Sequence, residues 1–281
     1  MTAHAWMLMP SGRRLDLLNP HPGDWTDDDL AIRLSRTYRW CSDTRWDRPL
    51  SVAQHSLTVL RLRQAASVRP LTPAEQLREL LHDAEEGVTN HDVPTPLKPL
   101  LGEAYHLTIE RIRRCIDDRY DVPGWDEASY AAHKQADRLA AASEARHVVG
   151  WSDADIRLGL DIAARPVLRD PLPPQQGLRP WEPWPAHLAA RLFGERLTQL
   201  QRNIVNGVCV APPTVLPDAA IPETGPTLVL VEGGGEVIEG RIVGGVRDDD
   251  GTWDLDGEFT VLTEEGDRIK VCGWNCITEV L

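Results

Sequence analysis

Two proline-rich stretches divide the chain into parts that follow different hydrophobic periods. Seven prolines lie between residues 165 and 185, and a second proline-rich stretch covers residues 212–226. Regular structure is excluded there, because proline lacks the backbone N–H and clashes with the preceding helical turn. Apolar residues recur at helical spacing before the first stretch. After the second, short runs rich in Val, Ile and Thr are separated by glycine-containing turns.

The first 165 residues predict a mainly α-helical domain. Thr26, Ser51 and Thr72 are side chains of the kind that cap helices, and each precedes a segment with helical apolar spacing. Thr72, Pro73 and Glu75 form a capping box with proline at the first helical position. Helices are expected after these three caps, and also at residues 105–118, 126–149 and 153–164.

The remaining chain predicts two further parts. Residues 166–226 are expected to form a proline-rich segment with one helix at about 186–206. Residues 227–281 contain five short strand-like runs, which predict a small all-β domain, either a barrel or a sandwich. No histidine follows His187, so catalytic groups are expected before this tail. The tail itself is expected to serve in packing or oligomerisation.

Composition excludes several classes of partner. A net charge of −13 argues against duplex nucleic acid, because a protein that contacts many phosphates needs a basic surface. No segment reaches the roughly 18 consecutive apolar residues of a membrane span. The five cysteines are scattered and odd in number, which fits a reducing cytoplasm better than a disulfide framework.

The segment Leu80-Leu81-His82-Asp83-Ala84-Glu85-Glu86 is the clearest candidate for chemistry. Neighbouring residues at a helix end point about 100° apart, so His82 and Asp83 can both reach one ion. Glu86 lies one turn beyond His82 on the same face. A set of imidazole and carboxylate ligands suits Mn, Co, Zn, Fe or Ni better than Mg. A His-Asp pair alone, however, is more often a surface or capping feature.

Two other residues change that assessment when they are taken together with the pair. His55 lies in an apolar helical segment, where a single histidine is usually a core residue. Asp137 lies among small and apolar neighbours, where a helix salt bridge is the ordinary explanation. The order His, His-Asp, Asp on three successive predicted helices is a more specific pattern than any of its members.

This order resembles the HD superfamily of metal-dependent phosphohydrolases, and in particular its 5′-deoxynucleotidase-like branch. The resemblance covers about residues 10–165 and implies an HD-type helical bundle. The motifs that carry it are Leu34-Ser35-Arg36, Arg39-Trp40, Ser51-Val52-Ala53-Gln54-His55-Ser56, the segment from Leu80 to Glu86, Asp92-Val93-Pro94-Thr95-Pro96-Leu97-Lys98, and Ala136-Asp137 with Glu144.

The resemblance also implies residue roles. Glu86 would hold or activate a water, and Asp92 would assist in orienting or protonating. The segment 89–92 is one residue longer than the family's usual spacing, which bears on Asp92. The other implied roles are metal ligation by His55, His82, Asp83 and Asp137, phosphate contact by Arg39, sugar packing by Trp40, and further substrate contacts by Arg36 and Lys98.

The expected reaction is metal-dependent hydrolysis of a nucleotide phosphoester, most simply a (deoxy)nucleoside 5′-monophosphate to nucleoside and phosphate. Bulk at Trp40 would exclude a 2′-hydroxyl and favour deoxynucleotides. Two alternatives stay open at this point. One is a deoxynucleoside triphosphate triphosphohydrolase or pyrophosphohydrolase of the same fold, and the other is a nucleotide-sensing binding module whose β tail binds a partner. Relatives of this type also imply a homodimer.

Overall fold

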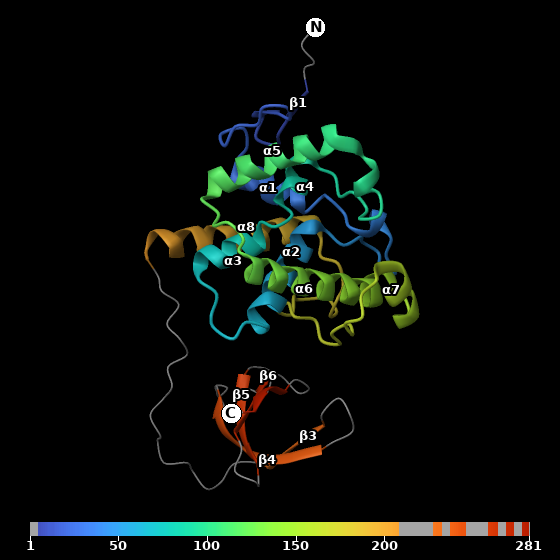
Figure 1. Cartoon of the computed structure of the whole chain (residues 1–281), viewed down its shortest axis with the longest axis vertical. Coiled ribbons are helices and arrows are strands. Elements are labelled where there is room, and N and C mark those ends of the chain that lie inside the picture. The colour runs from blue at the N-terminus through green and yellow to red at the C-terminus, as the bar shows by residue number, and fades with distance from the viewer. Residues whose placement is uncertain are drawn as a thin grey trace. The chain divides into compact units, whose positions relative to one another are not determined.

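The chain forms two compact units in a computed structural model, residues 1–212 and 213–281 (Figure 1). The structure describes residues 5–207 and the strand residues 227–231, 237–245, 258–263, 268–272 and 277–280. The first unit is mainly helical, as predicted. No helix in these described parts combines the length and the apolar character that a bilayer crossing needs.

The first unit contains a short hairpin followed by the helices. The hairpin, β1 (Trp6–Leu8) with β2 (Arg14–Asp16), is antiparallel and was not predicted. The α-helices are α1 (Asp27–Leu34), α2 (Val52–Ala65), α3 (Pro73–Leu80), α4 (Ala84–Thr89), α5 (Gly102–Tyr120), α6 (Glu127–Glu144), α7 (Asp153–Leu160) and α8 (Ala186–Val205). Short helical turns are η1 (Trp40–Ser42), η2 (Lys98–Leu100) and the π-helical turn η3 (Ala145–Val149).

The predicted helix starts are confirmed at the atomic level. The side chains of Thr26, Ser51 and Thr72 each accept a hydrogen bond from a backbone N–H three residues later. Two predicted helix ends differ from the structure. The segment 126–149 changes from α-helix to a π-helical turn after Glu144, and the segment 153–164 ends early because Asp161 adopts a left-handed backbone with φ of 52°.

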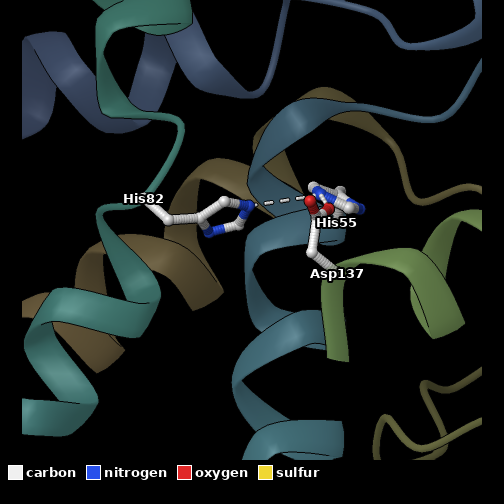
Figure 2. Close-up of side chains that lie close together, drawn as sticks. All are labelled: His55, His82 and Asp137. Carbon is white, nitrogen blue, oxygen red and sulfur yellow. Dashed lines mark hydrogen bonds and ion pairs between the residues drawn. The ribbon is translucent and has the colours of Figure 1, made fainter. Parts of the chain in front are cut away.

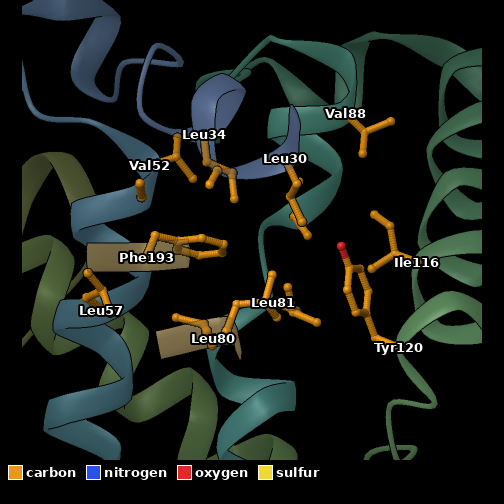
Figure 3. Packing of buried hydrophobic residues seen from close by; sticks show 14 of the residues in the cluster. Leu30, Leu34, Val52, Leu57, Leu80, Leu81, Val88, Ile116, Tyr120 and Phe193 are labelled. Atoms are coloured by element: carbon orange, nitrogen blue, oxygen red, sulfur yellow. The ribbon is translucent and has the colours of Figure 1, made fainter. Parts of the chain in front are cut away.

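Helix α8 completes the core of the first unit. Its buried residues Ala189, Phe193, Leu197 and Leu200 recur every three or four positions and so lie on one face. The helix contacts α1, α2 and α3, and Phe193 lies among the side chains of the cluster drawn in Figure 3. The compact unit therefore extends beyond the predicted boundary at residue 165, because this face is buried against the earlier helices.

Gly87 marks the closest approach of α4 to α1. A Cβ atom added there would lie 2.6 Å from Cγ of Leu34 and 3.2 Å from Cδ1 of Leu30. We expect Gly87→Ala to lower the free energy of unfolding by about 1–3 kcal/mol, the usual cost of overpacking a core. Urea unfolding of the full chain, followed by helical circular dichroism, measures this.

Gly194→Ala in α8 is the matched control, because its added Cβ would meet only Cβ of Ala31 at 3.7 Å. Alanine is the better helix former, so that variant should be neutral or stabilised by up to about 1 kcal/mol. Equal destabilisation by both variants would contradict the close approach.

The second unit contains five strands in one antiparallel sheet with the order β3-β4-β5-β6-β7, so each strand pairs with its neighbours in sequence. The strands are β3 (Thr227–Val231), β4 (Val237–Gly245), β5 (Glu258–Thr263), β6 (Arg268–Cys272) and β7 (Ile277–Val280). Four of the five predicted strand-like runs, at 227–231, 236–243, 258–263 and 268–271, coincide with β3 to β6. The run predicted at 252–255 lies outside the described residues, and β7 was not predicted. The form of the domain, barrel or sandwich, stays a prediction.

Candidate functional site

Three helical segments bring potential metal ligands together in the first unit. His55 comes from α2, His82 from the junction of α3 and α4, and Asp137 from α6 (Figure 2). Each offers one ligand atom, and these atoms all lie within 4.8 Å of one another. Nε2 of His55 is 3.3 Å from Nε2 of His82 and 3.4 Å from Oδ1 of Asp137. Such a set of donors suits a divalent transition metal.

Asp83 lies directly beside this group. Its Oδ2 is 3.1 Å from Nε2 of His82 and 3.5 Å from Nε2 of His55. His82 and Asp83 occupy the short break between α3 and α4, rather than the regular end of one helix. The backbone at Asp83, with φ of −114° and ψ of 23°, departs from helical geometry. The break, and not a shared helical edge, directs both side chains to the same place.

Hydrogen bonds from the other ring nitrogens orient the two histidines. Nδ1 of His55 lies 2.6 Å from Oε1 of Glu144, and Nδ1 of His82 lies 2.9 Å from the carbonyl oxygen of Glu79. Both partners are acceptors, so each Nδ1 carries the hydrogen in the neutral ring. The lone pair of each Nε2 then points into the cluster, which is the arrangement a metal-binding histidine needs.

The carboxylates of the cluster attract positive charge. Burial lowers the pKa of His82, but Asp83 outweighs it and the pKa is raised to about 9. Burial likewise raises the pKa of Asp137, but its hydrogen bond and charge interaction with His55 hold that pKa far below the ordinary value. A divalent cation would replace protons shared among these groups, because metal ligands must be deprotonated. The residues present therefore fit a metal site.

A cavity of about 960 Å³ opens beside the cluster. This volume is at the upper end of the range for sites that bind small molecules. His55 is fully buried and does not line the cavity, and neither does Arg36. Arg36 is exposed at the end of α1, where solvent stabilises its charge, so its predicted substrate contact has no support in this geometry. The predicted site residues that do line the cavity are Arg39, Trp40, His82, Asp83, Glu86, Asp92, Lys98 and Asp137.

Glu86 presents a carboxyl oxygen that has no hydrogen-bond partner. Its Oε1 lies 3.3 Å from Nζ of Lys98, whereas its Oε2 is buried and makes no hydrogen bond to any described residue. Burial, and then the charge of Asp83, raise the pKa of Glu86 to about 10. A perturbed carboxyl group in a cavity is a common sign of a residue that moves protons.

Glu144, which the motif resemblance includes without assigning it a role, is a central residue of the site. Its carboxylate is 1% exposed and accepts hydrogen bonds from Nε of Arg39 at 2.9 Å and from Nε1 of Trp40 at 3.2 Å, besides contacting His55. It follows Asp137 by two helical turns on α6, so the two share a face. That spacing is the signal in the sequence that points to Glu144.

The turn that carries Trp40 has an unusual backbone. Trp40, Cys41 and Ser42 have φ values of 58°, 51° and 69°, in the left-handed region that non-glycine residues rarely adopt. The Trp40 ring packs edge-on against Trp151, with 5.6 Å between the ring centroids. The contact with Glu144 and this packing together hold Arg39 and Trp40 at the cavity wall.

The chain is related to a protein whose name states no function. No family model matches the chain. The chain is 38% identical over 152 residues to an uncharacterized protein of Rhodobacter capsulatus, a match that covers 54% of this chain and 76% of that protein. Identity at this level over three quarters of the relative establishes common descent. The chain belongs to the family of this uncharacterized Rhodobacter capsulatus protein.

Proposed function

We propose that the chain is a metal-dependent phosphohydrolase that converts a (deoxy)nucleoside 5′-monophosphate to nucleoside and phosphate. The observation that carries the proposal is the convergence of His55, His82 and Asp137, with Asp83 beside them, at a cavity large enough for a nucleotide. The motif resemblance to the HD superfamily points to the same chemistry. The presence of the whole ligand set together with Glu86 favours an enzyme over a nucleotide-sensing module.

Four side chains would hold the metal: His55, His82, Asp83 and Asp137. When bound, a divalent transition metal supplies Lewis-acid polarisation of the phosphoryl group and lowers the pKa of water towards neutrality. Burial is the main cause of the raised pKa of Glu86, and neutralising the charge of Asp83 would remove the repulsion that raises it further.

Glu86 could then take a proton from the attacking water through Oε2. The water oxygen bonds to phosphorus as the bond to the 5′-oxygen breaks, and that oxygen leaves with a proton. Asp92, which lines the cavity, is the candidate donor of that proton. The guanidinium of Arg39, fixed at Nε by Glu144, offers its other nitrogens to the phosphate oxygens.

The charge balance of the cavity supports a monophosphate over a triphosphate. A triphosphate needs several cations that are free to contact its oxygens. Most cations at this cavity already face a carboxylate, which offsets their charge. These pairs are Arg39–Glu144, Lys98–Glu86, Arg113–Glu85 and Lys134–Asp137.

Phosphate release from a panel of nucleoside mono-, di- and triphosphates, each with Mn²⁺, Co²⁺ and Mg²⁺, tests this proposal. Deoxynucleoside monophosphates with Mn²⁺ or Co²⁺ should be the best substrates. If only nucleoside triphosphates are hydrolysed, with release of triphosphate or pyrophosphate, the alternative of a triphosphohydrolase or pyrophosphohydrolase of the same fold would be established instead. No turnover of any nucleotide with any of these metals would refute the proposal.

The location and assembly of the protein are also proposals. A cytoplasmic location is supported by the free thiols of Cys41, which is exposed, and Cys115, which is buried. A homodimer rests on the family resemblance alone.

Glu144→Gln tests the support of the metal ligands. The amide is neutral and leaves His55 and Arg39 without their anionic partner. Loss of a partner of this kind typically costs about 10–100-fold in metal affinity or activity. Mn²⁺ affinity measured by calorimetry should fall within that range. Glu127→Gln, at the exposed start of α6, is the control and should leave the affinity unchanged. Unaltered affinity in Glu144→Gln would contradict the positioning role.

A further inference from the structure

A buried arginine that lacks a carboxylate partner lines the same cavity. Arg78 of α3 is only 5% exposed. Its Nη1 donates to the carbonyl oxygen of Gly124 at 2.7 Å, and its Nε is buried without a hydrogen bond. It makes no ion pair within the described parts of the chain, unlike Arg39, Lys98 and Arg113. Burying a cation with no carboxylate in direct contact is costly, so the N–H groups of this guanidinium that make no hydrogen bond are candidate ligand-binding groups.

Aromatic rings surround Arg78 and connect it to the metal-ligand cluster. Its guanidinium lies 3.9 Å from the centroid of the Trp125 ring. The ring centroids of Trp125 and His133 are 4.6 Å apart, and those of His133 and His82 are 4.9 Å apart. Tyr130, half exposed, contacts Trp125 edge-on. A flat ligand with one end at His82 could therefore extend along this wall to Arg78.

His133 adds a hydrogen-bond acceptor at this end. Its Nδ1 lies 2.8 Å from Oε2 of Glu79, a carboxylate that is fully buried. Because that carboxylate accepts the hydrogen bond, Nδ1 carries the hydrogen in the neutral ring. Nε2 then has a free lone pair and makes no hydrogen bond to a described residue. The wall thus presents a donor at Arg78, an acceptor at His133 and flat apolar surfaces.

We propose that this end of the cavity, defined by Arg78, Gly124, Trp125, Tyr130 and His133, binds the base of the nucleotide and favours bases that carry a carbonyl oxygen next to a ring N–H. Guanine, thymine and uracil each carry a carbonyl acceptor next to a ring N–H donor, which match Arg78 and His133. Adenine lacks the carbonyl, and arginine pairs best with the carbonyl-bearing edge of guanine. Aromatic side chains are the usual surfaces on which unpaired bases stack.

A second phosphate is the competing occupant of this end. A second phosphate would require more than one free cation, and the aromatic rings would offer it no hydrogen-bond donors that neutralise its charge. The proposal rests on the proposed function, since that function places the phosphate at the metal-ligand cluster and so directs the base along the wall.

Binding of free nucleosides to the full chain in the presence of a chelator tests the base site without metal or turnover. Thymidine and deoxyguanosine should bind about tenfold more tightly than deoxyadenosine, the difference expected from one hydrogen bond to a charged group. Calorimetry measures the three affinities. In Arg78→Gln the preference should fall to within about twofold. Arg111→Gln, an exposed arginine on α5, is the control and should keep the preference.

Tyr130→Leu provides a second variant. Because the Tyr130 side chain is half exposed, its replacement should leave the fold stable. It should weaken all three nucleosides about fivefold or more, because stacking on an aromatic ring contributes about 1–3 kcal/mol per base. Equal binding of the three nucleosides by the unaltered chain would overturn the proposal. So would a Tyr130→Leu variant with unchanged affinities, or pyrophosphate that displaces thymidine while orthophosphate does not.

The failure of the base site and the failure of the proposed function give different results. If deoxyribose 5-phosphate and every nucleotide are hydrolysed with the same kcat/KM, the proposed phosphohydrolase activity is supported and the proposed base site is refuted. If the nucleosides bind with the expected preference and no phosphoester is hydrolysed, the proposed base site is supported and the proposed enzymatic activity is refuted.

Discussion

Asp137→Asn is expected to bind Mn²⁺ more than about 100-fold more weakly than the unaltered chain, because even groups that only support metal ligands contribute 10–100-fold. Asparagine keeps the shape of the side chain but removes its charge, and Lys134 at 2.7 Å would remain as an uncompensated cation. Phosphate release from deoxynucleoside monophosphates should become undetectable. Metal content after dialysis, measured by mass spectrometry, and phosphate release together give the result.

Asp117→Asn is the matched control for this variant. Asp117 lines the same cavity but lies outside the ligand cluster. Its replacement should leave the bound metal at the level of the unaltered chain. A stoichiometric metal content in Asp137→Asn would show that the cluster is not the metal site.

Glu86→Gln should lower kcat by about 10²–10⁴-fold, the usual contribution of general acid–base catalysis. The metal should stay bound, because Glu86 faces Lys98 rather than the ligand cluster. Glutamine fills the same space but cannot take a proton at the position of Oε2. Steady-state kinetics on protein with measured metal content separates the loss of chemistry from the loss of metal.

Glu85→Gln tests whether the effect is specific to position 86. The Glu85 carboxylate is engaged by Arg113, so its loss should affect stability more than kcat. If Glu86→Gln keeps kcat within about twofold of the unaltered chain while Glu85→Gln does not, Glu86 does not handle the proton.

The helical part and its ligand-type residues could be predicted because their signals are local. Caps such as Thr26 and Thr72 act within one turn, and the sequence alone shows them. His55 could be identified only from its order with His82 and Asp137, since a single histidine within an apolar helix is usually interpreted as a core residue. The place of α8 could not be predicted, because its amphipathic pattern says which face is buried but not against which helices.

The rest of the site depends on contacts between residues far apart in the chain. Glu144 meets Arg39 across 105 positions, and Arg78 meets Gly124 across 46. The hydrophobic periodicity of a sequence does not indicate which residues so far apart will be in contact. The left-handed backbone at Trp40 could not be predicted either, because no glycine occupies that position to indicate it.

Helix α6 contributes to every part of the site, since His133, Asp137 and Glu144 all project from one of its faces. Each residue of an α-helix advances the direction of its side chain by about 100°. Inserting or deleting a single residue between His133 and Glu144 would therefore turn at least one of the three away from its partner. Homologous proteins that retain the site should keep this stretch of α6 free of gaps.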